Sequence, residues 1–565
     1  MWWLLPATCL AAPPPLVETS VGSFRGVRTA SGGANFFGIP FAEPPVGALR
    51  WKKPQPVIHD GSPRDARTMG HNCFQNPSSS MMGWPQPLST QSEDCLYLNV
   101  YTGPKSNASG VPVLFWIYGG GFQGGGGNET RLNGTWDVAL MRGELIVVTS
   151  NYRLNVFGFA ASRDLQTREG GGASTGNYGL LDQRAAMKWV HEHIAHFGGD
   201  PSRVLLVGQS AGASSVSQHL VRPASWPYFS AAGMESGAFY DGLDTPTTAE
   251  LRPQWQKLAA YLECGGASDP TSCMASADPI ALLNSTLAGG IRAAWNPTID
   301  GVELSAPGPV LASNGTLAPV PIFAGYVLED INALGNPQCA GGKSSACTRD
   351  DFVALLAAND VAAVDRDRVA DLYATEGPRP GSDASGWYWA AKHAGAEAWA
   401  GCPARRVARW AASRGQRSYW YRWSYVPDGP NGKNLAHHAC EQPFVFHVLA
   451  ESAGETRVDG GVYHINATRE ASFSASVVRA WHAMASRGDP NVDGDVPWPL
   501  FNRSAHGSAR LFDGGAGEPP SIGASDDLIA ERCKYWDSWF WENPVRQRGQ
   551  APRRRAIDFR EGVYE

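Results

Sequence analysis

The stretch from Val204 to Gly212, VLLVGQSAG, decides the fold of this chain. Its first four residues are apolar, which is typical of a short strand buried on both faces, and they lead directly into a G-x-S-x-G pattern. Small residues beside a serine let the backbone turn sharply from a strand into a helix and lift the serine Oγ into a cleft. Residues 213–221 can form that helix, whose N-terminus would face developing negative charge. The sequence therefore predicts that Ser210 is a nucleophile.

The segments around this motif alternate between strand-like and helix-like patterns. Val111 to Tyr118 (VPVLFWIY) and Leu145 to Ser150 (LIVVTS) are near-continuous apolar runs, as expected for buried strands. Gly179 to Phe197 has apolar residues at helical spacing. This alternation predicts an α/β fold with a large, mostly parallel central sheet flanked by helices. The chain has no repeat, low-complexity linker or abrupt change of composition, so we expect a single domain with long insertions.

A glycine triplet follows the first of these strands, in the segment Tyr118-Gly119-Gly120-Gly121-Phe122. Without Cβ atoms, the backbone N–H groups of such a segment can approach a substrate oxygen closely. The N–H groups of Gly120 and Gly121, together with that of Ala211, are therefore predicted to form an oxyanion hole. Loss of one donor from such a site typically slows the reaction by ~100–1000-fold.

Composition and charge exclude several classes of function. The chain has 565 residues, of which 43% are hydrophobic and 10% aromatic, as in globular proteins. Its net charge of −6 is mild, and the absence of a basic stripe argues against nucleic acid as a partner. No later stretch reaches the ~18 uninterrupted apolar residues that a membrane span needs.

The N-terminus and the sequons favour secretion. Met1 to Ala12 is apolar and ends in small residues, so it resembles a short secretory signal, although it lacks a positively charged start. The alternative is a buried N-terminal segment. Seven N-x-Ser/Thr sequons predict a glycoprotein. They lie at Asn107, Asn128, Asn133, Asn284, Asn314, Asn466 and Asn502.

Three further segments carry a family resemblance: Phe37 to Gly47 (FGIPFAEPPVG), Ser92 to Val100 (SEDCLYLNV) and Gly176 to Gln183 (GNYGLLDQ). With the serine and glycine motifs, they resemble the type-B carboxylesterase/cholinesterase family, including its fungal-type carboxylesterases and lipases. The resemblance runs from about Val21 to about Trp541. It implies the α/β-hydrolase fold and a serine carboxylic-ester hydrolase.

The expected organisation has three parts. We expect a signal peptide at residues 1–12, the hydrolase domain at 16–545 and a C-terminal tail at 546–565. The resemblance implies a small-molecule ester as substrate, and no metal or organic cofactor.

The family places a histidine late in the chain, and Asn434 to Glu441 (NLAHHACE) resembles its H-G-x-E segment. Alignment on Glu441 selects His438 as the general base, with Ala439 in place of the usual glycine. His437 is the alternative. The Nε2 of the selected histidine would take the serine proton and return it to the leaving alcohol.

The family's acid falls in the pattern G-x-N-x-D-E-G, which Gly325 to Ile331 (GYVLEDI) resembles. Alignment on the first glycine assigns Asp330 as the acid, with Glu329 as the alternative. The order Ser210, Asp330, His438 is the order that α/β hydrolases use.

The cysteines look paired rather than catalytic, because Cys264 lies near Cys273 and Cys339 lies near Cys347, with turn residues between. The resemblance implies a framework of three disulfides, and one further bridge is expected as a local addition. The pairs are Cys73–Cys95, Cys264–Cys273, Cys402–Cys533 and the local Cys339–Cys347. Cys440 is left outside these pairs and is interpreted as a small buried apolar residue.

Further matches are interpreted as structural. Arg50 with Glu93, and Arg153 with Asp182, resemble family ion pairs that hold loops against the sheet. Ser236 resembles a serine that steadies the triad, although a plain turn residue is a close alternative.

Three residues are predicted to contact the substrate: Trp84, Phe122 and Gln209. Trp84 lies near the place where cholinesterases hold a quaternary ammonium by a cation–π contact, with a spacing to Cys95 that differs by one residue. Gln209 replaces the glutamate that cholinesterases have before the serine. Cholinesterase-like or lipase-like specificity is therefore an alternative to a general carboxylesterase. A catalytically silent adhesion or binding ectodomain is another alternative.

Overall fold

The computed structural model describes residues 14–58, 61–77, 86–104, 110–168, 170–239, 245–287, 291, 295–378, 382–427, 435–454, 464–501, 508–513, 521–526 and 529–542. The predicted signal and tail, Trp84, Asn107 and Asn502 lie outside the described residues. None of the helices in these ranges combines the length and the apolar character that a membrane crossing requires.

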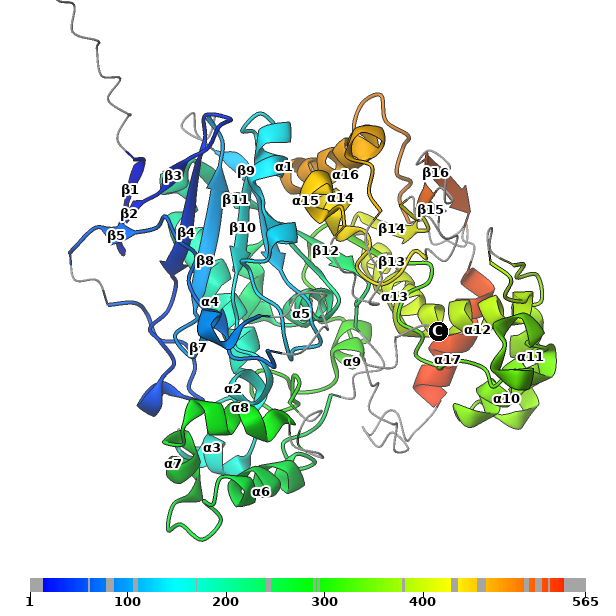
Figure 1. Cartoon of the computed structure of the whole chain (residues 1–565), viewed down its shortest axis with the longest axis horizontal. Coiled ribbons are helices and arrows are strands. Elements are labelled where there is room, and N and C mark those ends of the chain that lie inside the picture. The colour runs from blue at the N-terminus through cyan, green and yellow to red at the C-terminus, as the bar shows by residue number, and fades with distance from the viewer. Residues whose placement is uncertain are drawn as a thin grey trace, which may run out of the picture.

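Eleven strands of the described chain form one large sheet at the centre of the molecule (Figure 1). Side by side they are β16 (Ser521–Asp526), β15 (Ser508–Asp513), β14 (Ser418–Trp423), β13 (Ile322–Val327), β12 (Ala231–Glu235), β11 (Gly199–Gln209), β9 (Val111–Ile117), β10 (Ile146–Ser150), β8 (Tyr97–Thr102), β4 (Ala34–Pro40) and β3 (Val27–Arg28). Neighbours from β15 across to β10 are parallel, and the pairs at the two edges are antiparallel. The predicted large, mostly parallel sheet is confirmed.

Two small sheets lie outside the large one. They contain β1 (Leu16–Thr19), β2 (Gly22–Arg25) and β5 (Arg64–Asp65), and β6 (Asn72–Cys73) with β7 (Gln91–Ser92).

Helices flank the large sheet and gather in groups around it. They are α1 (Thr135–Leu140), α2 (Asn155–Phe159), α3 (Arg163–Arg168), α4 (Tyr178–His193), α5 (Ala211–Leu220), α6 (Arg252–Tyr261), α7 (Pro270–Ala275), α8 (Pro279–Leu287), α9 (Gly308–Ser313), α10 (Arg349–Ala358), α11 (Ala363–Leu372), α12 (Gly386–Ala396), α13 (Cys402–Ser413), α14 (Gln442–Val445), α15 (Leu449–Ser452), α16 (Ala467–Arg487) and α17 (Ala530–Glu542). In Figure 1, α10, α11, α12 and α17 lie together at one end of the molecule, and α6, α7 and α8 form a second group.

The central strands carry the chemistry-bearing turns at one edge of the sheet. Strand β11 lies between β9 and β12, with Val207 opposite Trp116. Because these strands are parallel, their carboxyl ends meet at the same edge, which is where open α/β sheets bind ligands. The glycine triplet follows β9, Ser210 follows β11, and the segment with Asp330 follows β13. Helix α5 packs against β11 and β12, and α16 packs against β9 and β11.

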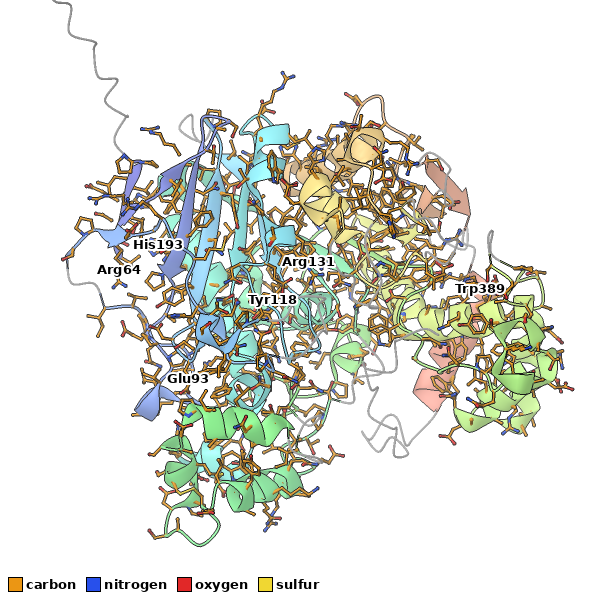
Figure 2. All side chains as sticks on the ribbon, viewed as in Figure 1. Arg64, Glu93, Tyr118, Arg131, His193 and Trp389 are labelled. Atoms are coloured by element: carbon orange, nitrogen blue, oxygen red, sulfur yellow. A yellow bond between two sulfur atoms is a disulfide. The ribbon has the colours of Figure 1, made fainter. Side chains whose placement is uncertain are left out.

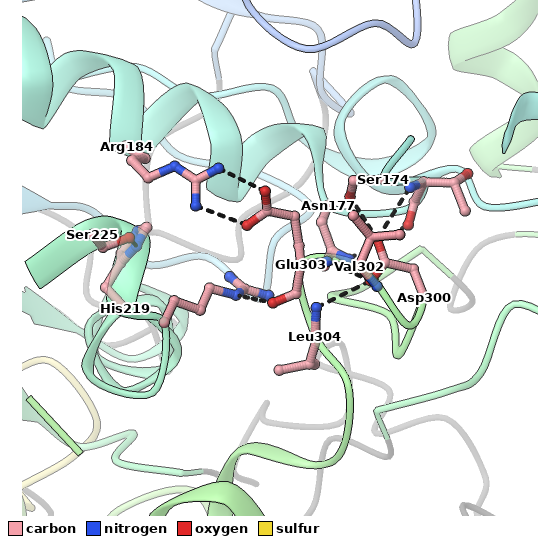
Figure 3. Close-up of polar contacts among 11 residues, drawn as sticks. Ser174, Asn177, Arg184, His219, Ser225, Asp300, Val302, Glu303 and Leu304 are labelled. Atoms are coloured by element: carbon pink, nitrogen blue, oxygen red, sulfur yellow. Dashed lines mark hydrogen bonds and ion pairs between the residues drawn. The ribbon is translucent and has the colours of Figure 1, made fainter. Parts of the chain in front are cut away.

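Figure 3 shows how the loop that contains Asp300 and Glu303 is anchored beside α4. Arg184 of α4 donates to both carboxylate oxygens of Glu303, at 2.8 and 2.6 Å. The carboxylate of Asp300 accepts a hydrogen bond from Ser174 Oγ at 2.5 Å. These contacts fix a long connection against a helix of the central layer.

Four disulfides are present in the described chain, and they are the four predicted pairs. They are Cys73–Cys95, Cys264–Cys273, Cys339–Cys347 and Cys402–Cys533. The side chain of Cys440 is buried and belongs to none of them. The last bridge joins the start of α13 to α17 across 131 positions of sequence, which ties α17 to a helix that packs against β13 and β14.

Both predicted ion pairs are present and buried. Arg50 donates to both oxygens of Glu93, at 2.7 and 2.5 Å, and also to the backbone carbonyl of Ala277. Arg153 forms the same bidentate contact with Asp182, at 2.8 and 2.7 Å. Because each guanidinium holds a carboxylate through two hydrogen bonds, these residues have a structural explanation.

Candidate active site

The turn between β11 and α5 holds Ser210 in a strained conformation. Its φ of 59° and ψ of −125° lie where a non-glycine residue is rarely found. Its backbone N–H donates to the carbonyl of Glu235 at 2.8 Å. A Cβ at Gly208 would lie 2.6 Å from the carbonyl oxygen of Ile117, and one at Gly212 would lie 2.0 Å from it. The two glycines are therefore required for this sharp turn to pack against β9.

The glycine triplet lies directly against the serine turn. A Cβ at Gly119 would lie 2.6 Å from the backbone oxygen of Gln209 and 2.8 Å from Ser210 Cβ, so any side chain there would collide with the turn. Gly120 and Gly121 have φ values of 111° and 61°. Among the described residues, their backbone N–H groups donate no hydrogen bond. These donors remain available to a ligand oxygen.

A pair of tyrosines fixes the start of this segment. Tyr118 stacks on Tyr152, with ring centroids 4.4 Å apart. Each hydroxyl donates to the backbone carbonyl of the other residue at 3.0 Å. Figure 2 shows Tyr118 near the middle of the molecule, whereas Trp389 lies on α12 at one end. The glycine triplet therefore begins from a rigid, fully buried point.

The structure brings Asp330 and His438 together. Asp330 Oδ1 lies 2.5 Å from His438 Nδ1, and the aspartate side chain is fully buried. A carboxylate accepts hydrogen bonds, so Nδ1–H of the imidazole is the donor of this contact. The indole of Trp399 packs edge-on against the imidazole, with centroids 5.1 Å apart. Trp399 lies on the π-helical turn Glu397–Gly401.

The two alternative residues have other partners. Glu329 accepts the backbone N–H of Ala436 at 2.8 Å and lies 3.4 Å from His393. The Nδ1 of His437 lies 2.9 Å from the backbone oxygen of His438. The geometry therefore favours Asp330 and His438 over Glu329 and His437 as the acid and the base.

Gln209 links the serine turn to the histidine. Its side chain is fully buried, and its amide Nε2 lies 3.2 Å from His438 Nε2. Its own Oε1 accepts from Gln442 at 3.2 Å. Ser210 Oγ makes no hydrogen bond to the described residues, and catalytic hydrogen bonds often form only when substrate is present. Because Gln209 directly precedes Ser210, its contact places the imidazole beside the turn.

Buried carboxyl groups lie behind these residues. Burial raises the pKa of Glu235 to about 8, and the indole N–H of Trp481 donates to it at 2.8 Å. Burial, and next the charge of Glu235, raise the pKa of Glu441 well above its usual range. Both groups therefore favour the protonated, uncharged form, which keeps negative charge away from the imidazole.

The remaining predicted residues have these positions. The hydroxyl of Ser236 is buried and has no hydrogen-bond partner among the described residues, so a direct contact with the triad is not seen. The ring of Phe122 is 1% exposed and packs edge-on against Phe159. Its side chain therefore contributes to the core.

Sequence reasoning missed three residues around the histidine: Glu235, Trp399 and Gln442. Glu235 directly precedes Ser236, and Gln442 directly follows the segment Asn434 to Glu441, so both are next to positions already singled out. Trp399 had no sequence signal, because only the fold brings its helical turn next to the histidine.

Comparison with known proteins decides the family. A family model described as the carboxylesterase family matches residues 13–536. The chain belongs to the carboxylesterase family. This carboxylesterase is a carboxylic ester hydrolase, and its eleven-stranded sheet with flanking helices is the α/β-hydrolase fold.

Two relatives of this carboxylesterase are cholinesterases. It is 29% identical to a cholinesterase of Mus musculus over 93% of the chain and 87% of the mouse protein. It is 34% identical to an acetylcholinesterase of Electrophorus electricus over 60% of the chain and 56% of that protein.

Proposed function

We propose that this carboxylesterase hydrolyses small carboxylic esters through an acyl-enzyme on Ser210, with His438 as general base and Asp330 as the acid that orients it. The observation that carries the proposal is the 2.5 Å contact of Asp330 with His438, beside the strained turn that holds Ser210. It supplies a base whose outer nitrogen accepts a proton, next to a half-buried serine at a sharp bend.

The first step would form the acyl-enzyme. Ser210 Oγ attacks the ester carbonyl carbon while its proton moves to His438 Nε2. The tetrahedral intermediate collapses by breaking the bond to the alkoxy oxygen, and the imidazolium returns the proton to that oxygen, which leaves as the alcohol. A neutral Nε2 has one acceptor site, so the Ser210 hydroxyl must replace the Gln209 amide there before proton transfer.

The second step would release the acid. Water attacks the acyl carbon and gives a proton to the same Nε2, and the collapse of the second intermediate returns that proton to Ser210. The N–H groups of Gly120, Gly121 and Ala211 would stabilise the oxyanion in both steps. Support comes from the close packing of the glycine segment on the serine turn.

We also infer that the chain is a secreted glycoprotein. Four disulfides in the described residues support an oxidising compartment. Three sequon asparagines, Asn284, Asn314 and Asn466, are exposed, although Asn466 also caps helix α16. Treatment of protein from a secreting host with a glycosidase should lower its mass; an unchanged mass would contradict the proposal.

Turnover of chromogenic esters of graded acyl length, alongside choline and feruloyl esters, tests the activity and its specificity. Choline esters are included because both relatives carry cholinesterase names. We expect turnover of uncharged esters and loss of turnover in Ser210→Ala. Undiminished turnover in that variant would reject the nucleophile assignment.

A fluorophosphonate probe tests the alternative of a silent binding ectodomain. The hydrolase proposal predicts covalent labelling of the wild-type chain and none of Ser210→Ala. An unlabelled wild-type chain would support the silent alternative.

A further inference from the structure

A cavity lies at the carboxyl ends of β13 and β14, on the side where α12 and α17 pack. Its volume is about 310 Å³. We call it the arginine cavity. Its lining includes Leu328, Glu376, His393, Glu397, Arg422 and Arg532, and none of Ser210, Asp330 or His438. It is therefore distinct from the candidate active site.

Both acids that line the arginine cavity are already engaged. Glu376 contacts Arg532 at 2.7 Å through one oxygen and His393 at 2.8 Å through the other. Glu397 accepts from Arg532 at 2.9 Å and from the hydroxyl of Tyr373 at 2.6 Å. No carboxylate oxygen of this lining is left for another cation at close range.

Arg422 is the remaining cation of the lining. It lies on β14 and is half-buried, and its side chain forms no ion pair or hydrogen bond with the described residues. Its Nε is buried without a partner among those residues. An unpaired half-buried guanidinium is unfavourable, because it loses water without gaining an acceptor.

The charges around the cavity leave an excess of one positive charge. Burial lowers the pKa of His393, but hydrogen bonds to Glu329 and Glu376 outweigh it and raise that pKa to about 9. Burial opposes ionisation of Glu376, yet its contacts with His393 and Arg532 lower its pKa to about 2. The lining therefore has three basic groups, His393, Arg422 and Arg532, and two acidic groups, Glu376 and Glu397. Behind it, Glu329 is balanced by the buried Lys392, whose pKa burial lowers to about 8.

We propose that the arginine cavity binds a small oxyanion, a carboxylate or a phosphate, held by the guanidinium of Arg422. The planar guanidinium matches both oxyanions with two parallel hydrogen bonds. The cavity is large enough for a short acyl group behind a carboxylate. Butyrate and inorganic phosphate are the two probes, and they distinguish a carboxylate ligand from a phosphate ligand. A carboxylate is also a product of ester hydrolysis.

Titration calorimetry of the full chain with butyrate, and separately with phosphate, tests this site. We expect binding of at least one probe, and about ten- to hundredfold weaker binding in Arg422→Gln. Arg422→Lys keeps the charge but lacks the planar guanidinium with its parallel donors. Its affinity for the probe should therefore lie between those of the wild type and Arg422→Gln. Arg252→Gln, at an exposed arginine on α6, is the matched control and should bind like the wild type.

Binding of butyrate alone would identify a carboxylate site, and binding of phosphate alone a phosphate site. Binding of neither probe, or equal binding by Arg422→Gln, would overturn the proposal. Crystals of the wild-type chain soaked with the bound probe give a readout that needs no variant. Density beside Arg422 supports the site, whereas density only beside Ser210 contradicts it. Neither result depends on whether Ser210 is the nucleophile.

Discussion

Gln209 lies within hydrogen-bond distance of His438. Replacing its amide by a carboxylate should therefore change the charge state of the histidine. Gln209→Glu would place a carboxylate beside the imidazole and favour the imidazolium. Because the base must be neutral, we expect the acid limb of kcat/KM to move to higher pH by about one unit. Gln209→Met, similar in size and uncharged, should not move the limb upward. A pH profile measures both, and an unmoved limb in Gln209→Glu would count against the contact.

The neighbouring acids Asp330 and Glu329 give a matched pair of variants. Asp330→Asn keeps the shape but removes the acceptor that orients His438, so kcat should fall by about 10⁴. Glu329→Gln should lower kcat by only a few-fold, since its contacts are with Ala436 and His393. Single-substrate kinetics compares the two. A larger loss in Glu329→Gln would reverse the assignment of the acid.

At the scale of elements, the ends of β9 and β11 are packed so closely that only glycine fits between them. Gly119→Ala would push the glycine segment away from the serine turn, because its Cβ would lie 2.6 Å from a backbone oxygen. We expect kcat to fall about 100-fold or more, as for loss of an oxyanion donor. Gly265→Ala is the control, since open space surrounds that glycine. Near-normal kcat in folded Gly119→Ala would refute this packing argument.

The sequence predicted the presence of helices and strands more accurately than their boundaries. The helix expected to run to Phe197 is α-helical only to His193 and then tightens into a 3₁₀ turn that ends at Gly198, whose φ is 88°. Strand β11 begins at Gly199, five residues before the apolar run at Val204, because polar residues at a sheet's rim carry no strand pattern.

The candidate site was predictable where one short motif contains the chemistry. Sequence motifs identified Ser210 and the glycine triplet. For the acid and the base, the motifs left two adjacent candidates each. Only tertiary structure separates Asp330 from Glu329, because their contacts come from distant segments. The cavity at Arg422 had no sequence signal, since its charged residues come from β14, α12, α17, the π-helical turn after α12 and the connection between α11 and α12.

At the scale of the whole molecule, buried carboxyls should couple stability to pH. The pKa of Glu235 is about 8 in the folded chain, against an ordinary value of 4.5. Its contribution is fully present below pH 4.5 and is lost as the pH rises through 8. Glu235→Gln lacks this loss, so its unfolding free energy relative to wild type should rise between pH 5 and 8 by a few kcal/mol, to order of magnitude.

Urea unfolding of both proteins at each pH measures this difference. Glu192→Gln, at an exposed position on α4, is the control and should show no such trend. A difference between Glu235→Gln and wild type that stays constant with pH would contradict the burial argument.

The central claim, that catalysis passes through an ester on Ser210, is tested most directly by trapping that ester. The chain is mixed with p-nitrophenyl acetate, quenched in acid within milliseconds, digested and analysed by mass spectrometry. The account predicts one acetyl group, on the peptide that contains Ser210, and none in Ser210→Ala. Acetylation of another residue during turnover, with Ser210 unmodified, would contradict it.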